Sequence, residues 1–177
     1  MAVYGAFTEG LQLFGSFAML LNFPRFGKMK GMGQVVTWSV RDESLHTEGV
    51  IRLFHEYAKE TQAYDKKLKN EIRDIAYEVV RLEDRFIDLA FEFGDQQNLS
   101  AKQVKDYIRY ICDWRLNQLK IKPIYNIKKY PLPWLRSLLN GVEHANFFET
   151  RATEYSKGST TGSWEDTWGV FNNKYKI

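Results

Sequence analysis

The sequence has only one cysteine and a small net charge. Cys112 is the only cysteine in 177 residues, which excludes an intrachain disulfide and suits a reducing, cytoplasmic compartment. The formal net charge is only +3, with 25 basic residues against 22 acidic ones. No basic cluster is interleaved with aromatic residues, so we expect no nucleic-acid partner.

The sequence also lacks a long, uninterrupted apolar run. Its most apolar stretch lies near the N-terminus, where Glu9, Gln12 and Asn22 interrupt it and no basic segment precedes it. A helix that spans a bilayer needs about 20 consecutive, mostly apolar residues. We therefore expect neither a membrane-spanning helix nor a signal peptide.

Helical periodicity is present over most of the chain, and 44% of the residues are hydrophobic. We expect an all-α domain over residues 1–140 and an extended tail over 141–177. The predicted helices cover residues 1–21, 34–64, 68–93, 100–120 and 134–140. The first is apolar nearly all round, which predicts burial on every side. Ser100 is expected to cap the fourth.

The clearest amphipathic pattern lies in the predicted helix 68–93. Apolar residues recur there at alternating intervals of three and four, which predicts a stripe facing the core: Leu68, Ile72, Ile75, Val79, Leu82, Phe86, Leu89 and Phe93. The charged residues of this helix, including Glu83 and Asp84, fall outside the stripe. We expect them to form a solvated face.

The end of the chain has the composition of a linker followed by aromatic residues. Lys157 to Ser163 is rich in glycine, serine and threonine, and four aromatic residues follow it: Trp164, Trp168, Phe171 and Tyr175. Aromatic residues in a loose tail favour a docking peptide. The alternative is a tail that folds back on its own domain.

Glu9 is the only charged side chain in the first 24 residues, and it lies in an apolar stripe. A buried carboxylate costs several kcal/mol unless it is protonated, paired with a cation or bound to a metal. We expect Glu9 to be a metal ligand. The alternatives are a protonated carboxyl and an ion pair with Arg41 or another distant cation.

Glu43 and His46 are three residues apart, so they lie on one face of the predicted helix 34–64. They continue a 3-4 row that predicts an inward-facing position: Val36, Ser39, Glu43, His46, Val50, Leu53 and Tyr57. An isolated Glu-x-x-His is more often a solvated pair than a ligand pair. Helix bundles with two metal ions take a Glu from each of two helices and a Glu-x-x-His from each of two others. This sequence contains one of each, which is half of such a site.

Several segments resemble the small, radical-generating subunit of class I ribonucleotide reductase. Arg41-Asp42-Glu43-Ser44-Leu45-His46 is similar to the family's RDE-x-x-H helix, and Glu9 precedes Glu43 at a spacing similar to that between the family's third and fourth carboxylate ligands. Two later segments are similar to the family's NPxPW and NFFExRxxEY motifs, in the same order: Tyr130-Pro131-Leu132-Pro133-Trp134 and Asn146-Phe147-Phe148-Glu149-Thr150-Arg151-Ala152-Thr153-Glu154-Tyr155.

The resemblance implies the C-terminal half of a ferritin-like bundle with a dinuclear metal site. Glu9, Glu43 and His46 would be ligands, mostly to one of two iron or manganese ions. Phe17 and Leu13 would line an apolar pocket beside the ions.

The resemblance also implies a route for a radical to the large subunit. Asp42, supported by Arg41, would hydrogen-bond a ligand histidine and a tryptophan on that route. Tyr155 would continue the route in the tail, and the residues after it would dock the large catalytic subunit.

The sequence departs from the family in two respects. It contains no counterpart of the family's first acidic ligand, first Glu-x-x-His pair, radical tyrosine or transfer tryptophan, which lie upstream of the matching region. Ser39 also stands where the family more often has an apolar residue.

We therefore expect half of a split subunit, completed by a partner chain that carries the other ligands, in a two-fold symmetric assembly. The rival interpretations are a non-catalytic accessory or remnant chain that binds the large subunit, and half of a related dimetal oxidase.

Overall fold

The computed structural model describes residues 1–143, with side chains described through residue 139. Within this range all regular elements are helices, as expected: η1 (Tyr4–Gln12), α1 (Leu13–Arg25), α2 (Lys30–Thr61), α3 (Lys66–Ala90), α4 (Ala101–Gln118) and α5 (Pro133–Glu143). The first helix was predicted to end at residue 21, which is too early, because α1 continues through Pro24 to Arg25. None of the described helices is long and apolar enough to cross a membrane.

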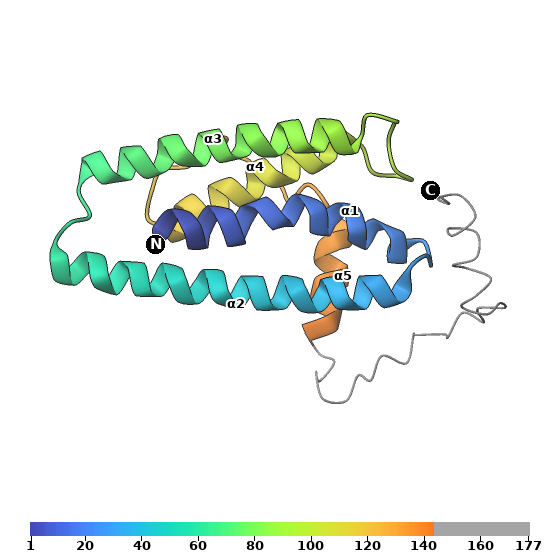
Figure 1. Cartoon of the computed structure of the whole chain (residues 1–177), viewed down its shortest axis with the longest axis horizontal. Helices are drawn as coiled ribbons and strands as arrows, with labels where there is room; N and C mark the ends of the chain where they lie inside the picture. The colour runs from blue at the N-terminus through green and yellow to red at the C-terminus, as the bar shows by residue number, and fades with distance from the viewer. Residues whose placement is uncertain (144–177) are drawn as a thin grey trace, which may run out of the picture.

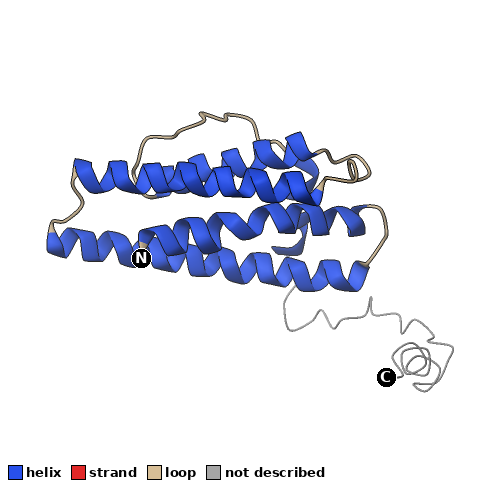
Figure 2. Ribbon diagram, turned by 45° about the horizontal axis from the view of Figure 1, so that its top comes forward, coloured by secondary structure: helices blue, strands red, loops and turns tan. Residues whose placement is uncertain are grey.

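The segment η1–α1 forms one continuous rod in the centre of the described fold. It packs against α2 on one side and against α4 and α3 on the other (Figure 1). Seen from a second direction, α2 and η1–α1 form one layer and α3 and α4 form another (Figure 2). Helix α5 runs across the long helices (Figure 1). The core between the layers includes several completely buried residues: Phe7, Leu11, Ala76, Ile87, Ile108 and Leu116.

The first nine residues of the rod form a π-helix, which the sequence pattern did not predict. A π-helix is wider than an α-helix and is common at functional sites. Glycine lets this wider segment lie close to α2, because a Cβ on Gly5 would be 2.5 Å from Val50 Cγ1 and a Cβ on Gly10 would be 2.8 Å from Thr47 Cγ2. The packing that brings η1 to α2 therefore requires glycine at both positions.

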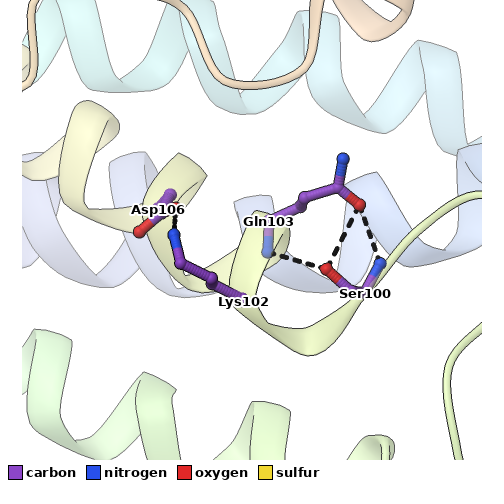
Figure 3. A network of polar contacts seen from close by, with 4 residues as sticks. All are labelled: Ser100, Lys102, Gln103 and Asp106. Carbon is purple, nitrogen blue, oxygen red and sulfur yellow. Dashed lines mark hydrogen bonds and ion pairs between the residues drawn. The ribbon is translucent and has the colours of Figure 1, made fainter.

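Helix α4 begins with a capping box, as predicted for Ser100. The Ser100 backbone N–H donates to Gln103 Oε1 at 2.9 Å, and the Gln103 N–H donates to Ser100 Oγ at 3.3 Å (Figure 3). One turn later, Lys102 Nζ donates to Asp106 Oδ2 at 2.6 Å on the exposed face. The two hydrogen bonds between Ser100 and Gln103 satisfy backbone N–H groups at the start of α4 that have no partner inside the helix.

The prediction of which stripe of α3 faces the core is wrong over most of the length of this helix. The buried residues of α3 are Ile72, Ala76, Val80, Glu83 and Ile87, and five predicted core residues are between 41% and 99% exposed: Ile75, Leu82, Phe86, Leu89 and Phe93. The physical reason is the period of the pattern. A strict 3-4 alternation repeats every 3.5 residues, whereas an α-helix has 3.6 per turn, so the row drifts by about 20° per heptad.

The same drift affects the row predicted in α2. Val36 is buried as expected, but Leu53 and Tyr57 at the far end are each 56% exposed. The buried face there consists of Thr47, Ile51, Phe54 and Ala58. The predicted row in α2 has therefore left the core by His46, whose side chain is 58% exposed.

Glu83 was predicted to lie on a solvated face and is instead only 6% exposed. Its Oε2 atom is buried without a hydrogen-bond partner and lies 3.3 Å from the position that a Cβ on Gly15 would occupy. Burial, and secondarily the neighbouring Asp84 carboxylate, raises the pKa of Glu83 to about 7. The absence of a side chain on Gly15 makes room for this carboxyl group inside the core.

Glu83→Gln is expected to make stability less dependent on pH. The pKa of Glu83 is about 4.5 when exposed and about 7 in the fold, so its contribution to stability is complete below about pH 4.5 and is lost as the pH rises through 7. The variant should gain about 2 kcal/mol over wild type at pH 8 and little at pH 5. Urea unfolding at both pH values tests this, with Glu92→Gln, an exposed acid just after the same helix, as the control. Equal gains at the two pH values would contradict it.

Candidate metal centre

Three side chains that can bind metal converge on one face of the layer formed by η1–α1 and α2. Glu9 comes from η1, and Glu43 and His46 come from adjacent turns of α2. One potential ligand atom from each lies within 4.8 Å of the other two. Glu43 Oε2 is 3.5 Å from His46 Nδ1. Since atoms that bind one small ion at about 2.1 Å lie at most about 4.2 Å apart, small side-chain rotations would suffice to bring all three to one ion.

The cluster lies on an open face, which corrects the expectation that these residues point into a core. Glu9 and Glu43 are partly buried, and the His46 side chain is 58% exposed. Apolar residues of the same rod are also exposed, namely Tyr4 at 60%, Leu13 at 38% and Leu20 at 37%. The first helix is therefore not buried on every side in the described fold, because its outer face has no neighbour there.

The alternative role considered for Glu9, an ion pair, is not seen within residues 1–143. No basic group there lies within ion-pair distance of Glu9, and Arg41 is exposed. Two carboxylates and one imidazole are donors that suit divalent iron and manganese. The residues present therefore fit a metal ion of this type, and three side chains leave coordination positions open.

The structure places the other predicted residues around this cluster. Asp42 is exposed on α2, next to Glu43. The Ser39 hydroxyl donates to the Val35 carbonyl at 3.3 Å, so its hydrogen is used within α2. Phe17 is partly buried and makes an edge-on contact with Phe14, with ring centroids 5.7 Å apart. Tyr155 and the aromatic tail lie outside the described residues.

Two buried residues that lie behind the cluster were not identified from the sequence. Thr47 and Arg115 are 0% and 1% exposed, and both lie against Gly10. A signal for Arg115 existed, because it continues the 4-3-4 row Val104, Ile108, Ile111 into the buried face of α4. In contrast, His55 is engaged elsewhere, since its Nε2 atom lies 2.8 Å from the Gln118 carbonyl oxygen.

Packed long helices that bring a Glu from one helix to a Glu-x-x-His pair on another are typical of helix bundles that bind metals through carboxylates. The sequence comparison specifies the family. The profile "Ribonucleotide reductase, small chain" matches residues 1–131, and the chain belongs to this family.

Individual relatives agree with this assignment. The chain is 48% identical over 166 residues to the probable ribonucleoside-diphosphate reductase small subunit 048L of Invertebrate iridescent virus 3, with 93% of this chain and 44% of the relative covered. It is 32% identical over 162 residues to the ribonucleoside-diphosphate reductase subunit beta of Chlamydia pneumoniae, with 91% and 46% covered.

A solved structure supports the fold. The putative class I ribonucleotide reductase of Bacillus halodurans superposes with a TM-score of 0.70 at 26% sequence identity, covering 75% of this chain and 43% of that chain. The chain thus spans 44%, 46% and 43% of the length of these three relatives.

Proposed function

We propose that this chain supplies half of the dinuclear metal site of a ribonucleoside-diphosphate reductase small subunit, which serves the reduction of ribonucleotides to deoxyribonucleotides. The observation that carries the proposal is the convergence of Glu9, Glu43 and His46 within 4.8 Å. The family match over residues 1–131 includes all three residues.

The other half of the site would come from helices that this sequence does not contain, on a separate chain. Two features support a missing neighbour: the coordination positions that three side chains leave open, and the exposed apolar residues beside them, Tyr4, Leu13 and Leu20. Exposed apolar patches of this kind mark interaction surfaces. The complete unit would then be a cytoplasmic assembly, doubled by two-fold symmetry.

In this proposal some residues of the chain bind metal, and others connect the metal site to a large catalytic subunit. Glu9, Glu43 and His46 would hold iron or manganese, which when bound supplies the one-electron oxidation that such subunits use. Asp42, exposed beside Glu43, would hydrogen-bond a group on the approaching helices. Tyr155 would lie on the route to the large subunit, and residues 141–177 would dock it.

Metal content tests the proposal. We expect the full chain alone to bind at most one ion weakly, and its complex with the missing helices to bind two ions per copy. For co-expression, we would take the missing helices from the part of the Invertebrate iridescent virus 3 relative that this chain does not cover. Two ions bound tightly by this chain alone, or none by the complex, would refute the proposal.

A tail deletion then separates the reductase from the rival functions. Removing residues 144–177 should leave the metal content of the complex unchanged and abolish ribonucleotide reduction with a large subunit. Unchanged turnover of another oxidation would identify a dimetal oxidase instead. A full-length complex that binds the large subunit without any turnover would identify an accessory chain.

A further inference from the structure

A buried guanidinium lies directly behind the metal-binding face. Arg115, from α4, is 1% exposed. Its Nε–H donates to the Gly10 carbonyl oxygen at 2.9 Å, and its Nη1 donates to Gln118 Oε1 at 2.9 Å. The Trp114 and Phe14 rings flank it, with centroids 4.3 and 5.4 Å from its Cζ. Within the described residues no carboxylate forms an ion pair with it.

Stability alone does not account for this arginine. The guanidinium keeps its charge at neutral pH, and a buried charge without an ionic partner costs several kcal/mol. Its Nη2 atom is buried without any hydrogen-bond partner, which adds to that cost. An unbranched apolar side chain of similar length would fill the same space without either cost.

The contacts of Arg115 lead to both helices that carry the metal-binding residues. Gly10 follows Glu9 in η1, and Thr47 follows His46 in α2. A Cβ on Gly10 would lie 2.8 Å from Arg115 Nε and 2.8 Å from Thr47 Cγ2, so three elements meet at this point without spare room. Any shift of the Gly10 carbonyl would move Glu9 relative to Glu43 and His46.

The hydrogen bond to Gly10 falls on a segment that needs external support. Gly10 lies in the π-helix η1, a form that is rare and usually confined to single turns. A donor fixed in the neighbouring layer therefore holds the backbone of η1 at the residue next to Glu9.

We propose that Arg115 is a positioning residue, which holds the Glu9 carboxylate beside Glu43 and His46 by fixing the Gly10 carbonyl group. The role of this position in metal binding rests on the proposed function. The effect of Arg115 on the distance between η1 and α2 does not rest on the proposed function. The positioning role and the metal-binding role can therefore be tested separately.

The first measurement is the distance between η1 and α2 in the full chain. Spin labels at Thr8→Cys and Glu48→Cys, both exposed sites, report it by pulsed EPR. Cys112 is 0% exposed, and burial raises the pKa of its thiol to about 12, so it should not be labelled. We expect one narrow distance distribution for wild type, and a broadened or shifted one for Arg115→Met.

The second measurement is Mn²⁺ binding by the complex that carries the missing helices, followed by EPR. Arg115→Met should weaken binding about 10- to 100-fold, while its melting temperature without metal stays equal to wild type or rises. Arg115→Lys, which can still donate to Gly10, should recover part of the affinity. Arg109→Met, on the same helix but paired with Asp84 at 2.7 Å, is the control that should destabilise the fold without changing Mn²⁺ affinity.

Each outcome decides one of the two proposals. An unchanged distance distribution in Arg115→Met overturns the positioning role, whatever happens to Mn²⁺ affinity. If Arg115→Met does not fold, Arg115→Leu, which also removes the hydrogen bond to Gly10, is judged by the same two measurements. A changed distance in a protein whose wild-type complex binds no Mn²⁺ would support the positioning of η1 and refute the proposed metal site.

Discussion

Glu9→Ala is expected to lower the affinity of the assembled complex for Mn²⁺ by more than about 100-fold, the upper end of what groups supporting metal ligands contribute. Glu9 is the only one of the three proposed metal ligands that η1 contributes. Without it, Glu43 and His46 remain as two neighbouring ligands on one helix, and the link between η1 and α2 through the ion is lost.

Stability measurements detect this loss without any assay of turnover. A ligand that binds only the folded state at 100 times its dissociation constant stabilises that state by about 2.7 kcal/mol. Wild type should show a gain of this size with Mn²⁺, and Glu9→Ala should show almost none. Without metal, the variant should be as stable as wild type, because Glu9 is partly exposed and has no ion pair in the described structure.

Glu48→Ala is the matched control, since it removes an exposed acid from α2 only two residues after His46. It should keep the Mn²⁺ affinity of wild type. If Glu9→Ala also kept that affinity, the convergence of the three side chains would have no role in metal binding.

Asp113→Ala is expected to be the most destabilising single change outside the apolar core, at about 4 kcal/mol. Asp113 is 4% exposed, and its carboxylate accepts three backbone N–H groups at 2.9 Å, from Ile124, Tyr125 and Ile127. Hydrogen bonds to a charged group contribute about 1.5 to 3 kcal/mol each, although such values do not add fully. The alanine variant leaves three donors without their acceptor.

The expected loss corresponds to a melting temperature about 12 °C lower for a domain of this size. Asp113→Asn should lose less, because one oxygen remains to accept two of the N–H groups while an amide N–H₂ faces the third. Asp106→Ala, which removes the exposed partner of Lys102 on the same helix, should cost less than about 1 kcal/mol. Thermal unfolding of the three variants measures these differences, and a loss below about 1 kcal/mol for Asp113→Ala would show that other contacts hold the segment.

The helices and the convergence of Glu9, Glu43 and His46 were predicted from the sequence for different physical reasons. Capping and turn residues mark helix ends locally, so Ser100 was placed correctly as the cap of α4. Glu43 and His46 were brought together by the three-residue spacing of a single helix. The approach of Glu9 to this pair depends on a contact between two helices, which residue spacing does not show. Glu9 was selected as a candidate ligand because it is the single acid in an apolar segment.

The buried faces were harder to predict, because small errors in period accumulate along a helix. A row with a period of 3.5 residues selected Leu82 in α3, whereas the straight helix buries its neighbour Glu83. The π-helix η1 has no local sequence signal, since its extra width is favoured by packing of Gly5 and Gly10 against α2. The His46 side chain is 58% exposed in the described fold, and the spacing of residues along α2 did not show which face of this helix would be left uncovered.

The exposed apolar side chains on α3 and in the turn after it affect how much of this protein a cell can accumulate. Phe86, Leu89 and Phe93 are 42%, 71% and 99% exposed, and none belongs to the helices that hold Glu9, Glu43 or His46. Copies whose apolar surface stays uncovered are prone to aggregate or to be retained by chaperones. If the proposed partner chain covers this surface, the yield of the assembled protein would follow the rate at which the partner is synthesised, and surplus copies of this chain would be cleared.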